Sequence, residues 1–183
     1  MAGEPSKACM CNPAASGGGY NAQGTYKEID GLKLYVTGPA TSKSGIVFIY
    51  DVYGFSDQNL LGADMLSNLT GSLVLMPDVL GEVVIPPSYG DFSGISEEEQ
   101  KAIRVRLMAK INGFQVIPGQ ILEGPAKWKS VTPSVETWAV FGLCFGGKVV
   151  ALTSREGTPF VVSGQAHPSQ VILPHPFVNA PMV

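Results

Sequence analysis

At 183 residues, with 45% hydrophobic residues and a net charge of -3, the chain is long and apolar enough for one domain with a sizeable core. This composition argues against disorder, and the charge gives no electrostatic basis for binding nucleic acid or an anionic membrane. No run approaches the roughly 18 apolar residues that span a bilayer, and the N-terminus lacks a signal-peptide pattern. An odd number of cysteines, three, does not make a disulfide framework. We therefore expect a cytoplasmic protein with no nucleic-acid or membrane partner.

Residues 1–23 are rich in Gly, Ser, Ala and Asn and show no hydrophobic period, which predicts a flexible N-terminal arm. The arm contains Cys9 and Cys11, which are too close together for the usual zinc spacing and have no further ligands nearby. We interpret them as incidental thiols of a solvated tail.

Residues 25–36 predict a β-hairpin, because Asp30-Gly31 between two alternating runs is a strong turn signal. Leu32 and Leu34 alternate with Lys33 and Tyr35, which suits a half-exposed sheet edge.

A continuously apolar run at residues 46–50 predicts a strand that is buried on both faces. A helix is expected after it, with Ser56 or Asp57 as the N-cap and Gly71 just past its end. The apolar residues of this helix are Leu60, Leu61, Met65, Leu66 and Leu69.

Further along, residues 73–76 and 160–164 predict two more buried strands, and residues 79–95 predict an irregular loop over the strand ends. A capping box at residues 96–99 begins a helix. Its apolar stripe is Ile103, Leu107, Ile111 and Phe114, and we interpret its charged side as a solvated face rather than a binding face. Residues 118–133 are poorly patterned and give no assignment. The alternation of strands and helices predicts an α/β fold with a mostly parallel sheet.

The stretch Gly-Leu-Cys-Phe-Gly-Gly at residues 142–147 lies between a strand-like run and a helix-like run, which predicts a strand, a sharp turn and a helix. A turn this tight strains its tip residue, Cys144, and the small residues Gly142 and Gly146 relieve the crowding. A thiol at a helix N-terminus is favoured as thiolate, and the N–H of Phe145 points to where an oxyanion would form. The alternative is a glycine-rich turn that holds a structural cysteine.

Residues 140–148 resemble the nucleophile elbow of the dienelactone hydrolase family, a cysteine branch of the α/β-hydrolases. Four further segments match the family in its order. Residues 46–55 resemble its third strand with the oxyanion loop, and residues 59–64 resemble the helix after it. Residues 73–78 resemble the next strand, and residues 166–169 resemble, in a fungal-like form, the segment after the sixth strand. The resemblance covers residues 24–169 and implies a partial dienelactone hydrolase-like domain with a doubly wound sheet.

The family places its catalytic aspartate after a seventh strand and its histidine after an eighth, and neither can be carried over onto the irregular Pro-rich tail, residues 170–183. We therefore expect an incomplete α/β-hydrolase fold, C-terminally truncated, that lacks the last two strands. A truncated gene model, a splice form and divergence all remain open. Without a seventh strand, residues 160–163 would present an unpaired apolar edge, which predicts self-association or poor solubility.

The resemblance implies hydrolysis of a small-molecule ester or lactone, with Cys144 as nucleophile and no metal or organic cofactor. The N–H of Val52 would be the second oxyanion donor beside that of Phe145. Asp51 either contacts the resting thiol, as in some family members, or ends a strand and binds local backbone N–H groups. His167 is a structural or pocket residue, or a substitute base.

We expect the activity of the 183-residue form to be impaired, because the family's aspartate and histidine are missing. Two alternatives stay open. One is a non-catalytic fragment or pseudoenzyme. The other is a redox or binding module that uses a reactive Cys144 without turnover.

Overall fold

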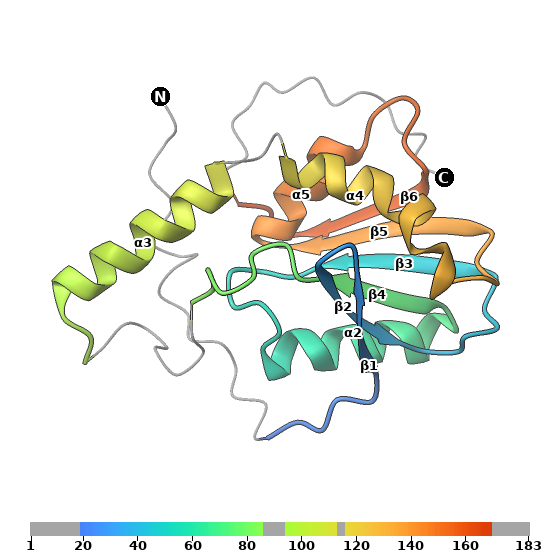
Figure 1. The fold of residues 1–183 in the computed structure, drawn as a ribbon, viewed down its shortest axis with the longest axis horizontal. Coiled ribbons are helices and arrows are strands. Elements are labelled where there is room, and N and C mark those ends of the chain that lie inside the picture. Colours follow the sequence, from blue (N-terminus) through green and yellow to red (C-terminus); the bar gives the residue numbers. More distant parts are fainter. Residues whose placement is uncertain (1–18, 86–93, 113–115, 170–183) are drawn as a thin grey trace.

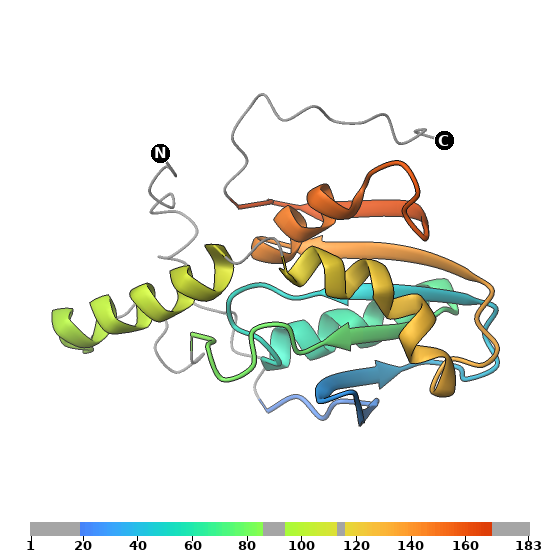
Figure 2. The same cartoon turned by 45° about the horizontal axis from the view of Figure 1, so that its top comes forward.

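The computed structural model describes residues 19–85, 94–112 and 116–169, which form a central sheet with helices on both faces (Figures 1 and 2). Within these residues the strand order is β1-β2-β4-β3-β5-β6. The strands are β1 (Thr25–Ile29), β2 (Leu32–Thr37), β3 (Ser44–Ile49), β4 (Leu73–Pro77), β5 (Thr137–Leu143) and β6 (Phe160–Ala166). The β1–β2 and β2–β4 pairs are antiparallel, and the β4–β3, β3–β5 and β5–β6 pairs are parallel. The predicted α/β class and mostly parallel sheet are confirmed.

The helices are divided between the two faces of the sheet. They are α2 (Asp57–Thr70), α3 (Glu97–Asn112), α4 (Val116–Lys127) and α5 (Phe145–Thr153), with a short 3-10 turn, η2 (Trp128–Ser130), after α4. Helix α2 covers one face, while α4 and α5 cover the other, and α3 extends away from the sheet at the left of Figure 1. The carboxyl ends of β3 and β5 therefore lie side by side between the two helical layers.

The N-terminal hairpin forms as predicted, but its two faces differ from the prediction. Asp30 and Gly31 have φ angles of 52° and 75°, which a two-residue hairpin turn requires. Leu34 is buried. The half-exposed edge expected for this strand is not found at Tyr35, which is buried and whose hydroxyl donates to the carboxylate of Asp64 in α2, at 2.7 Å.

Helix α2 has the predicted ends and a different buried face. The Ser56 side chain accepts from the first turn, and Gly71 ends the helix in the left-handed region at φ 67°. Among the apolar residues that predict the helix, Met65 and Leu69 are exposed at 52% and 80%. The buried residues are Asn59, Leu60, Ala63, Asp64 and Ser67. Polar side chains thus enter the interior on this helix.

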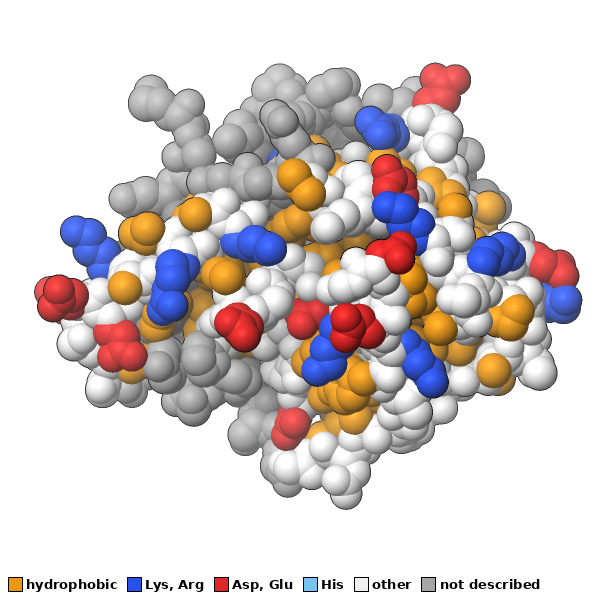
Figure 3. All heavy atoms as spheres, viewed as in Figure 1, with side chains coloured by type: hydrophobic (Ala, Val, Ile, Leu, Met, Phe, Trp, Pro, Cys, Tyr) orange, Lys and Arg blue, Asp and Glu red, His pale blue; other side chains and the backbone are white. Residues whose placement is uncertain are grey.

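Helix α3 begins at the predicted capping box, where the Ser96 hydroxyl accepts from the N–H of Glu99 at 3.2 Å. Its predicted stripe residues Ile103, Leu107 and Ile111 are buried, and Phe114 lies outside the described residues. Lysine, arginine and acidic side chains are interspersed over the face that Figure 3 shows, as expected of solvated helix surfaces.

Strand β6 hydrogen-bonds with β5 alone among the described residues and so ends the sheet there. Val161 and Val162 are exposed at 70% and 61%. The interpretation of residues 160–164 as a strand buried on both faces is therefore wrong, whereas the expected unpaired apolar edge is present in the described part of the chain.

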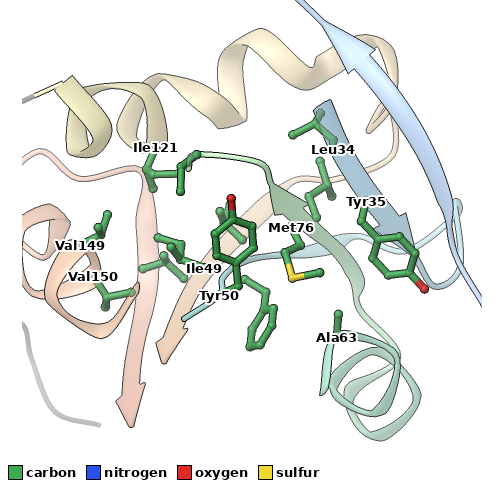
Figure 4. Close-up of a cluster of buried hydrophobic side chains, with 14 of the residues drawn as sticks. Leu34, Tyr35, Ile49, Tyr50, Ala63, Met76, Ile121, Val149 and Val150 are labelled. Atoms are coloured by element: carbon green, nitrogen blue, oxygen red, sulfur yellow. The ribbon is translucent and has the colours of Figure 1, made fainter. Parts of the chain in front are cut away.

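The core lies between the sheet and the two helical layers (Figure 4). Ala63 reaches it from α2, and Ile121, Val149 and Val150 reach it from α4 and α5 on the opposite face. Burying each large aliphatic side chain contributes about 1.5–3 kcal/mol. This packing holds α5, and with it the turn that precedes the helix, against the end of β3, where Tyr50 is also buried.

Candidate active site

The predicted strand, sharp turn and helix are confirmed around Cys144. This residue follows β5 directly, precedes α5 directly, and has φ 50° and ψ -112°. A residue other than glycine adopts such a backbone only under strain, which is the geometry expected at the tip of a sharp strand-to-helix turn. The Cys144 side chain is 6% exposed, so it lies just beneath the surface at the N-terminus of α5.

The two glycines that flank the turn are required by close backbone approach. A Cβ atom on Gly142 would collide with the carbonyl of Gly146, and a Cβ on Gly146 would collide with the carbonyl of Ile49. The first turn of α5 is therefore pressed against the end of β3. This contact brings the loop after β3 beside the elbow.

The segment after β6 holds the elbow from the other side. The Cys144 N–H donates to the Ala166 carbonyl at 3.1 Å, and the Cys144 carbonyl accepts from the N–H of Ser169 at 2.9 Å. His167 lies between these two anchors, exposed and with φ 37°. The structure thus places His167 at the same edge of the sheet as Cys144.

The loop after β3 is a tight turn from Asp51 to Gly54. The Asp51 carboxylate accepts from the N–H of Tyr53 at 2.9 Å and from the side-chain amide of Asn59 at 2.8 Å. The Asp51 carbonyl accepts from the N–H of Gly54 at 3.4 Å, which closes the turn around Val52. Of the two roles considered for Asp51, the binding of local backbone N–H groups is observed.

Burial raises the pKa of Asp51, and hydrogen bonds from Asn59 and Tyr53 and the positive form of His167 partly oppose the rise. Asp51 and His167 are therefore close enough to interact electrostatically. The sheet register explains this: Ile49 pairs with Gly142, and Leu143 pairs with Ala166. Because these strands are parallel, the residues that follow them emerge at one edge.

A cleft of about 270 Å³ adjoins this turn, between the loops that follow β3 and β4. Its lining residues are Tyr53, Phe55, Ser56, Asp78, Gly81 and Val84. Cys144 is not among them, so the cleft lies beside the Val52 loop rather than over the thiol. The candidate site is therefore defined by the geometry of the elbow, not by this cleft.

Sequence reasoning missed Asn59, which the structure places in the first turn of α2 with its amide against the Asp51 turn. The only sequence signal was its position in a segment similar to the family's helix. Across residues 19–85, 94–112 and 116–169, no group of three or more His, Cys, Asp or Glu residues could hold a metal ion, and no helix there is long and apolar enough to cross a membrane. Cys9 and Cys11 lie outside these residues.

The family model of the dienelactone hydrolase family matches residues 32–180. The chain belongs to the dienelactone hydrolase family. The match extends past Ser169, where the resemblance was expected to stop. Two uncharacterized AIM2 family proteins of Schizosaccharomyces pombe are 31% and 30% identical over 87% and 85% of this chain. These fungal relatives agree with the fungal-like segment at residues 166–169, and this chain spans 64% and 61% of their lengths.

Solved structures show the same fold. The dienelactone hydrolase from Anabaena variabilis superposes with a TM-score of 0.54 at 14% identity, covering 79% of this chain and 62% of its own. A cold-adapted esterase from an Arctic intertidal metagenomic library gives a TM-score of 0.53 at 14% identity, covering 78% of this chain and 58% of its own. This family member therefore has an incomplete α/β-hydrolase-type sheet in its described residues.

Proposed function

We propose that this dienelactone hydrolase family member acts on small esters or lactones through Cys144. The observation that carries the proposal is the strained backbone of Cys144 between β5 and α5, with φ 50° and ψ -112°. That geometry supports a nucleophile at a helix N-terminus, where the thiolate is favoured. Family membership supports the reaction class and a small-molecule substrate.

The thiolate of Cys144 would attack the ester carbonyl carbon and form a carbon–sulfur bond. The N–H groups of Phe145 and Val52 would stabilise the negative charge that develops on the carbonyl oxygen. Collapse of this intermediate breaks the bond to the leaving oxygen, which takes a proton, and leaves a thioester. Water then hydrolyses the thioester and restores the thiol.

We expect turnover to be much slower than acylation. A positioned base contributes about 100- to 10,000-fold to such steps, and His167, the one histidine within the described residues, is exposed. Its place at the edge that carries Cys144 makes it the first candidate for a substitute base.

Burst kinetics with 4-nitrophenyl acetate test the proposal. We expect a rapid release of nitrophenolate, stoichiometric with protein, and then a slow phase, and we expect the burst to vanish in Cys144→Ala. A burst that persists in Cys144→Ala would contradict the proposal. Reversible oxidation of Cys144 without any burst would favour the redox or binding module.

Self-association through the edge of β6 remains a separate prediction. Exposed apolar edges pair readily with other chains, and Val161 and Val162 are exposed there. Gel filtration of the wild type should show assemblies larger than one chain, and replacing Val162 by lysine should reduce them. A wild type that elutes as a monomer would contradict this prediction.

A further inference from the structure

We propose that Asn59 is a positioning residue that fixes the N–H of Val52 as an oxyanion donor. The inference rests on the proposed function, because an oxyanion donor matters only if Cys144 attacks a carbonyl. Asn59 would touch neither substrate nor thiol and would act through the turn that contains Val52.

The geometry of Asn59 ties together both ends of that turn. Its side chain is 1% exposed, and its amide nitrogen lies 2.8 Å from the Asp51 carboxylate and 2.8 Å from the Gly54 carbonyl. Val52 lies between these two anchored residues. One buried side chain in the first turn of α2 therefore holds the whole turn.

The hydrogen-bonded turn from Asp51 to Gly54 directs the N–H of Val52 outward. The carbonyl of Asp51 points inward to the N–H of Gly54, at 3.4 Å. In a trans peptide the carbonyl and the following N–H point in opposite directions. The N–H of Val52 therefore points away from the turn. On its other side, the Val52 carbonyl accepts from the N–H of Ile85 at 2.9 Å.

The unpaired atom of Asn59 supports a role for its donors. The amide nitrogen of Asn59 donates to both Asp51 and Gly54. The buried Oδ1 of the same side chain has no hydrogen-bond partner among the described residues. A buried acceptor without a partner destabilises the folded protein. The side chain therefore keeps two donor contacts to the turn at the expense of one buried acceptor.

Two reactions of the same thiol separate positioning from general damage. Acylation of Cys144 by 4-nitrophenyl acetate passes through an oxyanion, whereas alkylation by iodoacetamide needs only the thiolate. In Asn59→Ala we expect acylation to slow by about 10- to 100-fold, as for a displaced oxyanion donor, while alkylation changes less than about twofold. Asn59→Ser, which keeps one donor, should recover part of the loss and should serve where Asn59→Ala does not fold.

Asn68→Ala is the matched control, because Asn68 lies on the same helix with an exposed side-chain contact to Gln23 at 3.5 Å, and both of its rates should equal those of the wild type. The proposal is overturned if the Asn59 variants acylate as fast as the wild type, or if acylation and alkylation fall together. A wild type that is alkylated but never acylated would instead refute the proposed function, and this inference with it.

Discussion

Two carboxylates are associated with helix α2: Asp51 accepts a hydrogen bond from Asn59 of this helix, and Asp64 lies in the helix itself. They differ in the number of hydrogen bonds that they accept. Asp64 is 1% exposed and accepts from the hydroxyls of Tyr20 and Tyr35 and from the N–H of Gln23, at 2.7–3.0 Å. Burial acts to raise the pKa of Asp64, but the hydrogen bonds outweigh it and hold the pKa below its usual range. At Asp51 burial is the larger effect, and the pKa is raised.

The difference shows what each carboxylate does. Asp64 is stable as an anion and accepts from Tyr20 and Gln23, so the described part of the predicted N-terminal arm is bonded to α2. Burial and the neighbouring Asp64 raise the pKa of Tyr35, which keeps its hydroxyl protonated as a donor. Asp51 has fewer donors and lies at the edge that carries Cys144. Its many hydrogen bonds give Asp64 a structural role, whereas burial decides the direction of the pKa shift of Asp51.

The largest expected effect is on stability. Asp64→Asn should lower the free energy of unfolding by about 2–4 kcal/mol, because a neutral amide cannot replace a charged acceptor of several buried bonds. Asp51→Asn should change it by less than about 1 kcal/mol, because the Tyr53 N–H and the Asn59 amide both contact one carboxylate oxygen of Asp51, which an amide oxygen can replace. Urea unfolding of the two variants beside the wild type measures both. Equal losses of stability, or a larger loss for Asp51→Asn, would contradict the claim that Asp64 contributes more to stability than Asp51.

The two carboxylates should also give opposite dependences on pH. The lowered pKa of Asp64 means that its contribution is complete above the unfolded value of about 3.9 and is lost on further acidification. The raised pKa of Asp51 means that its contribution is present at low pH and is lost as pH rises above about 3.9. Thermal unfolding from pH 3 to pH 7 should therefore show a weaker acid destabilisation in Asp64→Asn and a stronger one in Asp51→Asn than in the wild type. The reverse order would refute the assignment.

A smaller effect is expected from a single donor to Asp64. Tyr20→Phe removes the hydroxyl that lies 2.8 Å from the carboxylate and should lower stability by about 0.5–1.5 kcal/mol. Tyr26→Phe is the control, because the Tyr26 side chain is 46% exposed, and its loss of a hydroxyl should change little. Limited proteolysis should also cut near Tyr20 faster in Tyr20→Phe. An unchanged cutting rate would show that the other donors suffice to hold this segment.

Local patterns allowed much of the fold to be predicted. The elbow around Cys144 and the hairpin turn at Asp30 depend on glycine spacing within a few residues, so the sequence alone indicates them. Helix α4 could not be assigned, because Pro118 and Pro125 resemble helix breakers. Pro118 lies in the first turn of α4, where its missing N–H is not needed.

Tertiary contacts decide what the sequence could not show. Tyr35 alternates like an exposed residue and is buried because Asp64, distant in the sequence, accepts its hydroxyl. Asn59 lies in a segment similar to the family's helix, but nothing local predicts its contacts, since these depend on where α2 meets the Asp51 turn. The Cys144 elbow and the segment of the Asp51–Gly54 turn could each be found from the sequence. The buried Asn59 amide that holds this turn could not.

The most direct test of the account is to map the acyl group itself. Wild-type protein is exposed briefly to 4-nitrophenyl acetate at neutral pH, digested, and analysed by peptide mass, with Cys144→Ala treated in parallel. The account predicts an acetyl thioester on the peptide that contains Cys144 and no thioester in the variant. Acetylation confined to the peptide of Cys9 and Cys11, or to lysines alone, would contradict the central claim that Cys144 is the nucleophile.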